Sequence, residues 1–339
     1  MGVFHNTSVF FALCISAVVV LLSLVDMPLN PWLAMGGQLR ETTIVDSNES
    51  DRYPLTIIDP VGREMVIAEK PRRIVSAILA GDEMLMALVD QRNVVSVTYL
   101  VDQPANKNVN GFYDASILRN HGDIEEILSV EPDLVLVAAY SNAASVELLL
   151  ASGVPVVRVA NYHSHQDLRD NVRLLSRVLG VEGRGEQWIA EMDRRIDRVQ
   201  MAVKNQTRPR VLYYSLGGAT RAPGTLMDES IVYAGGYNVV AETGLKGYTQ
   251  ISKEMAISLL PDVILLDDRM AQDEGVGRDQ LMNDYAWAEV PAIKNNRVYS
   301  ERNPLLLSVT PARVLGLNQL ARWLHPAVFE PIADVESPL

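Results

Sequence analysis

Apolar side chains recur at the period of an α-helix through residues 184–205, a segment that is otherwise polar. The apolar positions, spaced four, four, three and four residues apart, are Trp188, Met192, Ile196, Val199 and Val203. This spacing puts them on one face, and the segment contains no proline. We therefore predict one uninterrupted helix, about 30 Å long at a rise of about 1.5 Å per residue. So narrow a stripe favours a helix that connects two folded bodies; an ordinary long surface helix is the alternative.

The segments on either side of this predicted helix resemble each other. Residues 123–137 read DIEEILSVEPDLVLV and residues 252–266 read SKEMAISLLPDVILL. Each has a helix-capping residue, a Glu two positions later, a short apolar helix, a Pro-Asp pair and an apolar run typical of a buried parallel strand. Pro132 and Pro261 are 129 residues apart, and the two Glu residues have the same offset. We therefore expect two α/β lobes of one kind.

Strand and helix patterns alternate along the rest of the chain. Before the long helix we expect strands at residues 56–58, 64–67, 73–76, 94–98, 134–138 and 156–159, and helices at 82–89, 145–151 and 164–179. After it we expect strands at 210–214, 239–240, 263–266 and 298–299, and helices at 230–234 and 311–324. The first two strands flank a turn and form a hairpin. Asp82 is expected to cap its helix, Ser164 to begin a capping box, and residues 99–122 to form a long loop.

This alternation predicts the α/β class: two Rossmann-like lobes with parallel sheets, joined by a single long backbone helix. We place the N-terminal α/β lobe at residues 54–182, the connecting helix at 183–207 and the C-terminal α/β lobe at 208–330. Residues 37–53 are polar and are predicted to form a flexible leader. Residues 1–36 are predicted to be a signal peptide or an N-terminal anchor.

The prediction for the N-terminus depends on an apolar run at residues 9–25, interrupted only by Ser16 and Ser23. Its length lies between a signal-peptide core and a short membrane-spanning helix. We favour a cleaved export signal, and an uncleaved anchor is the alternative. Cys14, the single cysteine, excludes an internal disulfide and a Cys-based metal cluster. It lies too early, and among the wrong neighbours, for a lipoprotein site.

The length of the chain and its net charge limit the number of domains and the kinds of binding partner that we expect. A chain of 339 residues can form two domains with a large core. Its formal net charge of −12 argues against nucleic acid or an anionic membrane surface as the main partner. We expect a monomer.

In parallel sheets, ligands bind outside the carboxyl ends of the strands. The loops that follow the predicted strands should therefore line a gap between the lobes, and they contribute Tyr99, Asp102, Tyr113, Tyr140, Tyr162, His163, Arg221, Asp267, Asp268, Arg269, Tyr299 and Arg302. This set is rich in Tyr and Arg and contains no nucleophile, base and orienting residue that we can assemble. We therefore predict a binding site and no catalytic residues.

Several motifs, in this order, resemble the substrate-binding proteins of ABC importers for iron complexes and cobalamin. They are DPVGR (59–63), PRRIVS (71–76), Glu83, GVPV (153–156), AGGYN (234–238), PDVI (261–264), RVY (297–299) and LHP (324–326). No single motif is specific, but their order over residues 56–329 is. The family fold is two α/β lobes joined by one long helix, which agrees with the predicted helix and repeat.

The resemblance implies capture of a ligand in the periplasm or at the cell surface and its delivery to a membrane permease with an ATPase. It also implies that one Glu on each lobe meets Arg residues of the permease; by position in the repeat these are Glu125 and Glu254. The alternative is an acidic residue in a first helical turn, where the helix dipole favours it. We expect no intrinsic cofactor and a bound ferric siderophore, with haem and cobalamin as alternatives.

Ligand contacts are predicted for Tyr and Arg residues of the gap. Arg221 and Arg302 are the leading candidates to pair with ligand oxygens, and the full predicted set is Tyr99, Tyr140, Tyr162, Arg221, Arg269, Tyr299 and Arg302. Tyr99 and Tyr140 could stack on a flat ligand or ligate haem iron. For each Arg the alternative is a local acidic partner, and for each Tyr it is packing at a strand end.

We predict no metal site. His163 and His165 have the spacing of a weak metal pair, but His165 lies inside the capping box and is expected to be an exposed first-turn residue. Two further classes of function stay open on the same scaffold: a metallo-enzyme or redox subunit, and a membrane-anchored sensor.

Overall fold

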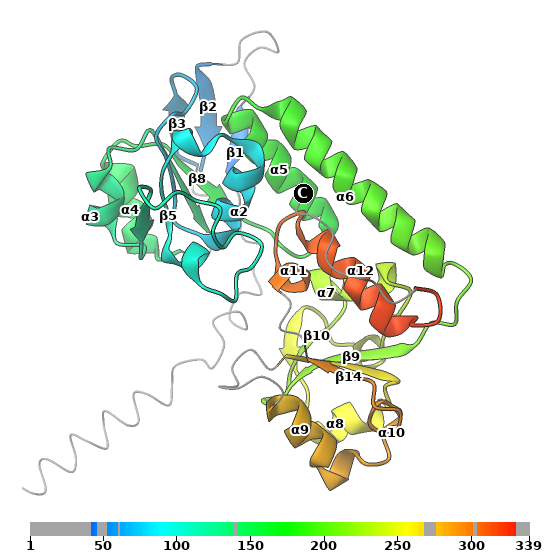
Figure 1. The fold of residues 1–339 in the computed structure, drawn as a ribbon. Helices are drawn as coiled ribbons and strands as arrows, with labels where there is room; N and C mark the ends of the chain where they lie inside the picture. The colour runs from blue at the N-terminus through cyan, green and yellow to red at the C-terminus, as the bar shows by residue number, and fades with distance from the viewer. Residues whose placement is uncertain are drawn as a thin grey trace, which may run out of the picture. The chain divides into compact units, whose positions relative to one another are not determined.

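The computed structural model describes residues 42–45, 53–59, 62–138, 141–267, 276–300 and 304–329. The predicted signal peptide or anchor lies outside these residues. Within them, no helix is both long and apolar enough to cross a membrane. Three sheets carry the strands, two of them large and one small (Figure 1).

The small sheet is antiparallel and has the order β1-β2-β3. It contains the predicted hairpin, β2 (Leu55–Ile58) and β3 (Glu64–Ile67), whose turn ends at Gly62 with a φ of 89°. This positive φ is why a glycine is required there. Strand β1 (Thr43–Val45) pairs with β2. These three β-branched residues fall inside the predicted flexible leader, and for them that prediction is wrong.

The sheet of the first lobe is parallel throughout, in the order β6-β5-β4-β7-β8. Its strands are β4 (Ile74–Ser76), β5 (Val94–Thr98), β6 (Leu118–Asn120), β7 (Leu134–Ala138) and β8 (Val156–Val159). Its helices are α2 (Leu79–Leu88), α3 (Ile124–Ser129), α4 (Ala143–Ala151) and α5 (His165–Val178). The capping box at Ser164 is confirmed. Every residue of β7 is buried, as expected for the centre of a parallel sheet.

Two details of the first lobe differ from the predictions. Helix α2 begins three residues before Asp82, which does not cap it. Asp82 is fully buried instead, and its carboxylate accepts hydrogen bonds from the amide and hydroxyl groups of Thr98 at 3.3 and 2.5 Å. Strand β6 lies inside the predicted loop 99–122 and is held by Asn120, whose side-chain amide donates to Ser76 O at 2.9 Å and to Val97 O at 3.0 Å.

The sheet of the second lobe has the order β12-β10-β9-β13-β14, and β11 also pairs with β9. Its strands are β9 (Arg210–Ser215), β10 (Ala219–Arg221), β11 (Tyr237–Asn238), β12 (Tyr248–Gln250), β13 (Val263–Asp267) and β14 (Val298–Ser300). Its helices are α7 (Leu226–Tyr233), α8 (Lys253–Ser258), α9 (Val276–Asn283), α10 (Pro291–Lys294), α11 (Pro304–Leu307) and α12 (Arg313–Leu324). Strands β9, β13 and β14 are parallel as predicted, whereas β10 and β12 form an antiparallel edge. The strand expected at residues 239–240 is wrong: it is the 3₁₀ helix η4 (Val239–Thr243).

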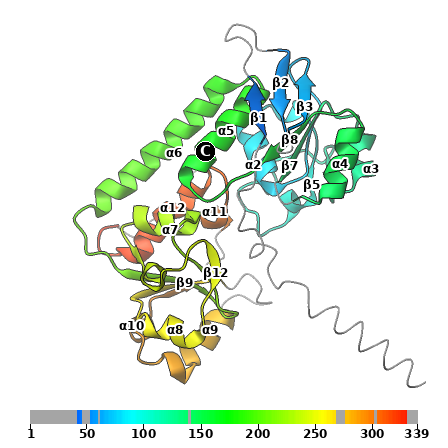
Figure 2. The same ribbon diagram turned by 180° about the vertical axis from the view of Figure 1, so that it is seen from behind.

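The connecting helix is confirmed as α6 (Glu182–Val203), an unbroken 22-residue helix. Its apolar stripe divides between the two cores. Trp188 and Ile189 pack into the core of the first lobe, and Met192, Ile196 and Val199 pack into that of the second. Accordingly, α6 contacts α2 and α5 as well as α7 and α12 (Figures 1 and 2). A helix shared by two cores explains the narrow stripe better than a surface helix of one lobe.

The two halves of the repeat have the same local structure. Asp123 caps α3 and Ser252 caps α8, each through its side chain. The residue before each repeat proline has an uncommon positive φ, 45° at Glu131 and 43° at Leu260. The Asp that follows each proline accepts a backbone hydrogen bond at 2.9 Å, Asp133 from the amide of Arg73, which directly precedes β4, and Asp262 from that of Arg210, the first residue of β9. The 129-residue repeat is therefore a structural repeat.

Besides α6, a buried polar contact joins the lobes. Glu83 of α2 is 4% exposed, and its carboxylate accepts hydrogen bonds from the hydroxyls of Ser308 at 2.6 Å and Thr310 at 2.7 Å. Arg313, 3% exposed at the start of α12, donates to Ser308 O at 2.9 Å and to the Ser230 hydroxyl at 3.0 Å. The segment between α11 and α12 is thereby fixed to both lobes.

Candidate ligand-binding site

Arg221, a predicted ligand residue, lies between two tyrosine rings on the antiparallel edge of the second sheet. Its guanidinium carbon is 5.0 Å from the centre of the Tyr213 ring and 4.8 Å from that of Tyr248. Strand β9 supplies Tyr213, and β12 places Tyr248 directly opposite Arg221. The side-chain amide of Asn238 fixes the backbone by donating to Arg221 O at 2.8 Å. The cation is thus held by aromatic faces, a favourable contact for Arg.

Asp267, the last residue of β13, lies beside this cation. It accepts a hydrogen bond from the Tyr213 hydroxyl at 2.8 Å. Its carboxylate is 3.9 Å from Arg221 Nη2, too far for a hydrogen bond. Among the described residues, the guanidinium donates only one hydrogen bond, to Thr220 O at 3.4 Å. We call Tyr213, Arg221, Tyr248 and Asp267 the Arg221 cluster.

The first lobe reaches this cluster through the loop between β8 and α5. The ring centre of His163 is 6.3 Å from that of Tyr248, and His163 is exposed. Its backbone amide is held by Asp167 of the capping box at 2.8 Å. Tyr162, another predicted ligand residue, is half-buried and packs against the cores of both lobes. Side chains of both lobes therefore meet here.

A second aromatic surface lies at the carboxyl ends of β5 and β6. Tyr99, predicted as a ligand residue, is 41% exposed, and its ring stacks on that of His121 with centres 4.7 Å apart and planes 15° apart. Both rings come directly after parallel strands, at the edge where such sheets bind ligands.

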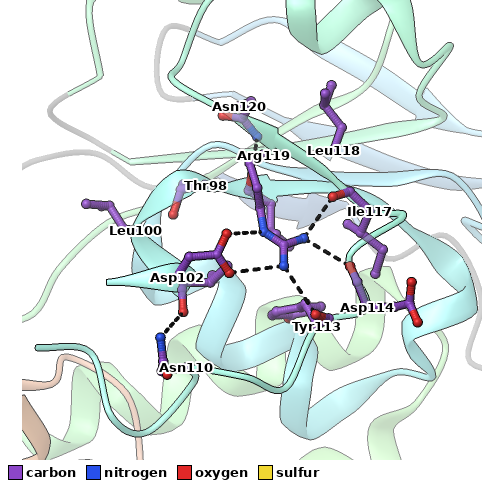
Figure 3. A network of polar contacts seen from close by, with 12 residues as sticks. Thr98, Leu100, Asp102, Asn110, Tyr113, Asp114, Ile117, Leu118, Arg119 and Asn120 are labelled. Atoms are coloured by element: carbon purple, nitrogen blue, oxygen red, sulfur yellow. Dashed lines mark hydrogen bonds and ion pairs between the residues drawn. The ribbon is translucent and has the colours of Figure 1, made fainter. Parts of the chain in front are cut away.

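Arg119 holds the loop that follows Tyr99 (Figure 3). Its guanidinium binds both carboxylate oxygens of Asp102, at 2.8 and 3.1 Å, and donates to the backbone carbonyls of Tyr113, Asp114 and Ile117. All five N–H donors of the Arg119 guanidinium are used within this loop. Asp102 therefore stabilises the loop through Arg119. Tyr113 is 5% exposed and donates its hydroxyl to Asp82 O at 2.5 Å, and burial raises its pKa. Neither Asp102 nor Tyr113 joins the exposed aromatic surface.

Of the other predicted ligand residues, Tyr299 is described and lies outside the Arg221 cluster. Tyr299 is half-buried and stacks on Trp323 of α12, with ring centres 5.0 Å apart and planes 9° apart. Tyr140, Arg269 and Arg302, like Asp268, lie outside the described residues, so their roles stay predictions. Neither Tyr213 nor Tyr248 is among the predicted residues, because the first reads as a buried strand position and the second lies on a strand that the sequence pattern does not reveal.

The expectation for His165 is wrong. The residue is 1% exposed, and its Nδ1 and backbone amide both contact one carboxylate oxygen of Glu229, at 2.8 and 2.7 Å. Burial lowers the pKa of His165. The histidine thus packs α5 against α7 and forms no metal pair with the exposed His163. Across the described residues, no group of three or more His, Cys, Asp or Glu side chains could hold a metal ion.

Glu125 and Glu254, the predicted docking residues, occupy equivalent positions in the first turns of α3 and α8, and both are exposed. The Glu254 carboxylate accepts hydrogen bonds from its own backbone amide and from the Ser252 hydroxyl, and these lower its pKa. Each lobe thus presents one exposed carboxylate at matching places in the repeat.

A pocket of about 370 Å³ lies away from these sites, at the start of α6 between Lys70, Leu88 and Gly180. Its lining includes residues that directly precede β4 and β5, so it lies at the amino ends of the parallel strands. Ligands of such sheets bind at the opposite edge, and we therefore assign the site from the Arg221 cluster and the Tyr99–His121 surface.

Two α/β lobes joined by a single long helix, with side chains of both lobes meeting at a partly exposed cation, are the architecture of a two-lobed solute-binding protein. The chain belongs to the periplasmic binding protein family, whose model matches residues 74–304. It is 24% identical over 292 residues to the uncharacterized ABC transporter substrate-binding lipoprotein YvrC of Bacillus subtilis, covering 83% of this chain and 89% of that one. It is 25% identical over 297 residues to a cobalamin-binding protein of Halobacterium salinarum, covering 85% and 74%.

Solved structures agree with the fold. The apo haem-binding protein RhuT of Roseiflexus sp. RS-1 matches with a TM-score of 0.64 and 26% identity, covering 76% of this chain and 99% of that one. The molybdate-bound protein MolA of Haemophilus influenzae matches with a TM-score of 0.64 and 20% identity, covering 81% and 92%. The predicted fold class and family are confirmed. The ligands of these proteins differ, so the family alone does not identify the ligand of this chain.

Proposed function

We propose that the protein captures an anionic metal chelate, in the first place a ferric siderophore, at the Arg221 cluster and delivers it to an ABC importer. The observation that carries the proposal is the arginine itself. Its side chain is 15% exposed, and its guanidinium lies over two tyrosine rings. Within the described part of the chain the guanidinium donates one hydrogen bond, which leaves other donors for a ligand. Catecholate, hydroxamate and carboxylate oxygens are the acceptors that such a fork pairs with.

The placement of the cluster supports capture between the lobes. His163 of the first lobe approaches Tyr248 of the second, so a ligand on Arg221 would touch both lobes. The rings hold the cation in place before binding, which reduces the entropy lost when a ligand binds. A ligand that fills this junction would displace water and contact the aromatic rings and the guanidinium, which is already held in position.

Haem is the second candidate, and the stacked pair of Tyr99 and His121 favours it. An exposed pair of parallel rings is a platform for a flat macrocycle, and both residue types can ligate haem iron. The carboxylates of haem would suit Arg221. The molybdate and cobalamin named for relatives are further ligands to test.

For delivery, we propose that Glu125 and Glu254 meet basic residues of the permease. Two ionised carboxylates at equivalent places on the two lobes would fix orientation by charge complementarity. A binding role, rather than an enzymatic one, fits the described residues of the site, where no nucleophile is hydrogen-bonded to a base with an orienting partner. We further propose that residues 1–36 direct export and that the mature protein is a monomer.

Native mass spectrometry of the full chain against ferric siderophores, haemin, cyanocobalamin and molybdate tests the proposal. We expect a one-to-one complex with a ferric siderophore that weakens at least about tenfold in Arg221→Gln, as for loss of one charge-assisted contact. Arg194→Gln is the matched control, because that side chain is 67% exposed on α6. Binding of haemin alone would favour the second candidate. Failure of all these ligands to bind, or equal binding by Arg221→Gln, would contradict the proposal.

A further inference from the structure

We infer that Asp267 is a specificity-determining residue, an internal counter-ion with which an anionic ligand must compete for Arg221. The inference rests on the proposed function, since it concerns the same cation. It assigns to Asp267 a role in setting which anions the cluster accepts and how tightly it holds them.

The distances between the two charged groups carry the inference. A committed Arg–Asp pair makes hydrogen bonds near 2.8 Å, as Arg119 does with Asp102. The shortest separation between Arg221 and Asp267 is 3.9 Å, although both are largely buried, at 15% and 12% exposure. The two charges therefore attract each other without using up the guanidinium donors.

Asp267 cannot close this gap freely, because the Tyr213 hydroxyl holds its carboxylate at 2.8 Å. The same Tyr213 ring lies beneath the guanidinium. Tyr213 is fully buried, so one rigid side chain holds the carboxylate and supports the cation. The Arg221–Asp267 separation is thus fixed by the fold.

A carboxylate fixed at this position has two effects on a ligand. It repels any anion that approaches Arg221, so binding requires ligand oxygens that interact with the cation more strongly than Asp267 does. It does not penalise a neutral ligand in the same way. Asp267 therefore lowers affinity for weakly interacting anions and keeps a bound chelate releasable, an example of specificity through repulsion.

The experiment compares Asp267→Asn with the wild type by titration calorimetry. The amide keeps an oxygen acceptor for Tyr213 and removes the charge. The anionic probes are a ferric catecholate siderophore, haemin and ferric citrate, and the neutral probe is cyanocobalamin. We expect affinity for whichever anionic probe the wild type binds to rise about tenfold, as for removal of one nearby like charge, with no rise for cyanocobalamin.

Two further variants locate the effect. Asp279→Asn makes the same charge change on α9, where the side chain is 74% exposed, and should leave affinity unchanged. Asp267→Asn should give no gain when combined with Arg221→Gln, because the two residues act on one ligand group.

The outcomes separate the inference from the proposed function. If the wild type binds an anionic probe through Arg221 but Asp267→Asn binds it no better, the inference is overturned and the proposed function stands. An equal gain in Asp279→Asn would also overturn it, because the effect would then be one of net charge. If no anionic probe binds or Arg221→Gln changes nothing, both fail together.

Discussion

Replacement of Glu83 should measure how strongly the inter-lobe contact stabilises the fold. In Glu83→Ala, the buried hydroxyls of Ser308 and Thr310 lose the carboxylate that accepts from them at 2.6 and 2.7 Å. Ser308 is 6% exposed and Thr310 is fully buried, so water replaces the lost acceptor poorly. Each buried donor left without a partner costs about 1–3 kcal/mol. Removing a buried carboxylate offsets part of that cost, and we expect a net loss of about 2–4 kcal/mol.

Urea unfolding, monitored by tryptophan fluorescence, gives the change in unfolding free energy from the midpoint and the slope of the transition. Glu83→Gln keeps the shape and one acceptor oxygen and should lose only about 1 kcal/mol. Glu69→Ala removes an exposed Glu from the same lobe and is the control. Surface substitutions typically change the unfolding free energy by no more than about 0.5 kcal/mol. If Glu83→Ala lies within that range of the wild type, the contact does not stabilise the junction and the reasoning is refuted.

The pH dependence provides a second check on the same residue. Burial raises the pKa of Glu83 above its ordinary value of 4.5, so the folded state binds more protons than the unfolded state in the window above that value. Stability contributed by Glu83 is therefore present at low pH and is lost as pH rises through the folded pKa. Burial also raises the pKa of Asp82, to about 7, with the same sign. In Glu83→Gln, the part of this loss of stability that comes from Glu83 should be absent. If the variant and the wild type show the same dependence of unfolding free energy on pH, the raised pKa of Glu83 is contradicted.

Four further predictions follow from other contacts. Arg119→Met should cost about 2–4 kcal/mol, because five acceptor oxygens lose the guanidinium that donates to them, and should make residues 99–117 sensitive to limited proteolysis; unchanged cleavage would count against it. Because burial lowers the pKa of His165, its contribution to stability should fall as pH falls through its ordinary value of 6.5, opposite in sign to the contributions of Asp82 and Glu83. His165→Asn should remove this fall, measured as the difference between variant and wild type in denaturation series at pH 7 to 5. Glu125→Lys with Glu254→Lys should leave ligand affinity unchanged but lower uptake in cells at least about tenfold; equal loss of both would argue against docking. X-ray scattering with and without ligand should show a small change in radius of gyration, since α6 and the Glu83 contact both join the lobes; a large decrease would contradict it.

The features that the sequence predicted well are those specified by neighbouring residues. The stripe from Trp188 to Val203 determines α6 because helix periodicity is local. The repeat was detectable because capping, a Pro-Asp pair and an apolar strand each have a local signal. Pro132 and Pro261 accordingly lie in matching structures.

The features that it missed depend on residues distant in the chain. Strands β6, β10 and β12 have three residues each and little apolar alternation, so only their neighbours in the sheet define them. His165 was expected at the surface, but Glu229, which buries it, is 64 residues away. Arg221 was predicted from its residue type and from its place in a loop after a predicted strand. The structure puts it on strand β10, and its position against two rings required an antiparallel edge that the alternating pattern did not indicate.

The repeat and the binding site follow opposite principles of construction. Equivalent positions in the two lobes carry the caps, the prolines and the two glutamates proposed to dock on the permease, and these belong to the scaffold. Strand β4 pairs only with parallel strands, β5 and β7, among the described residues, whereas β9 pairs with the antiparallel strand β10 as well as with the parallel strands β11 and β13. Strand β12 then pairs with β10 and places Tyr248 opposite Arg221. The first lobe instead presents Tyr99 and His121. One lobe thus presents a charge and the other an aromatic surface. Under the proposed function, a ligand with both anionic and flat parts that contacts both surfaces would bind in one orientation.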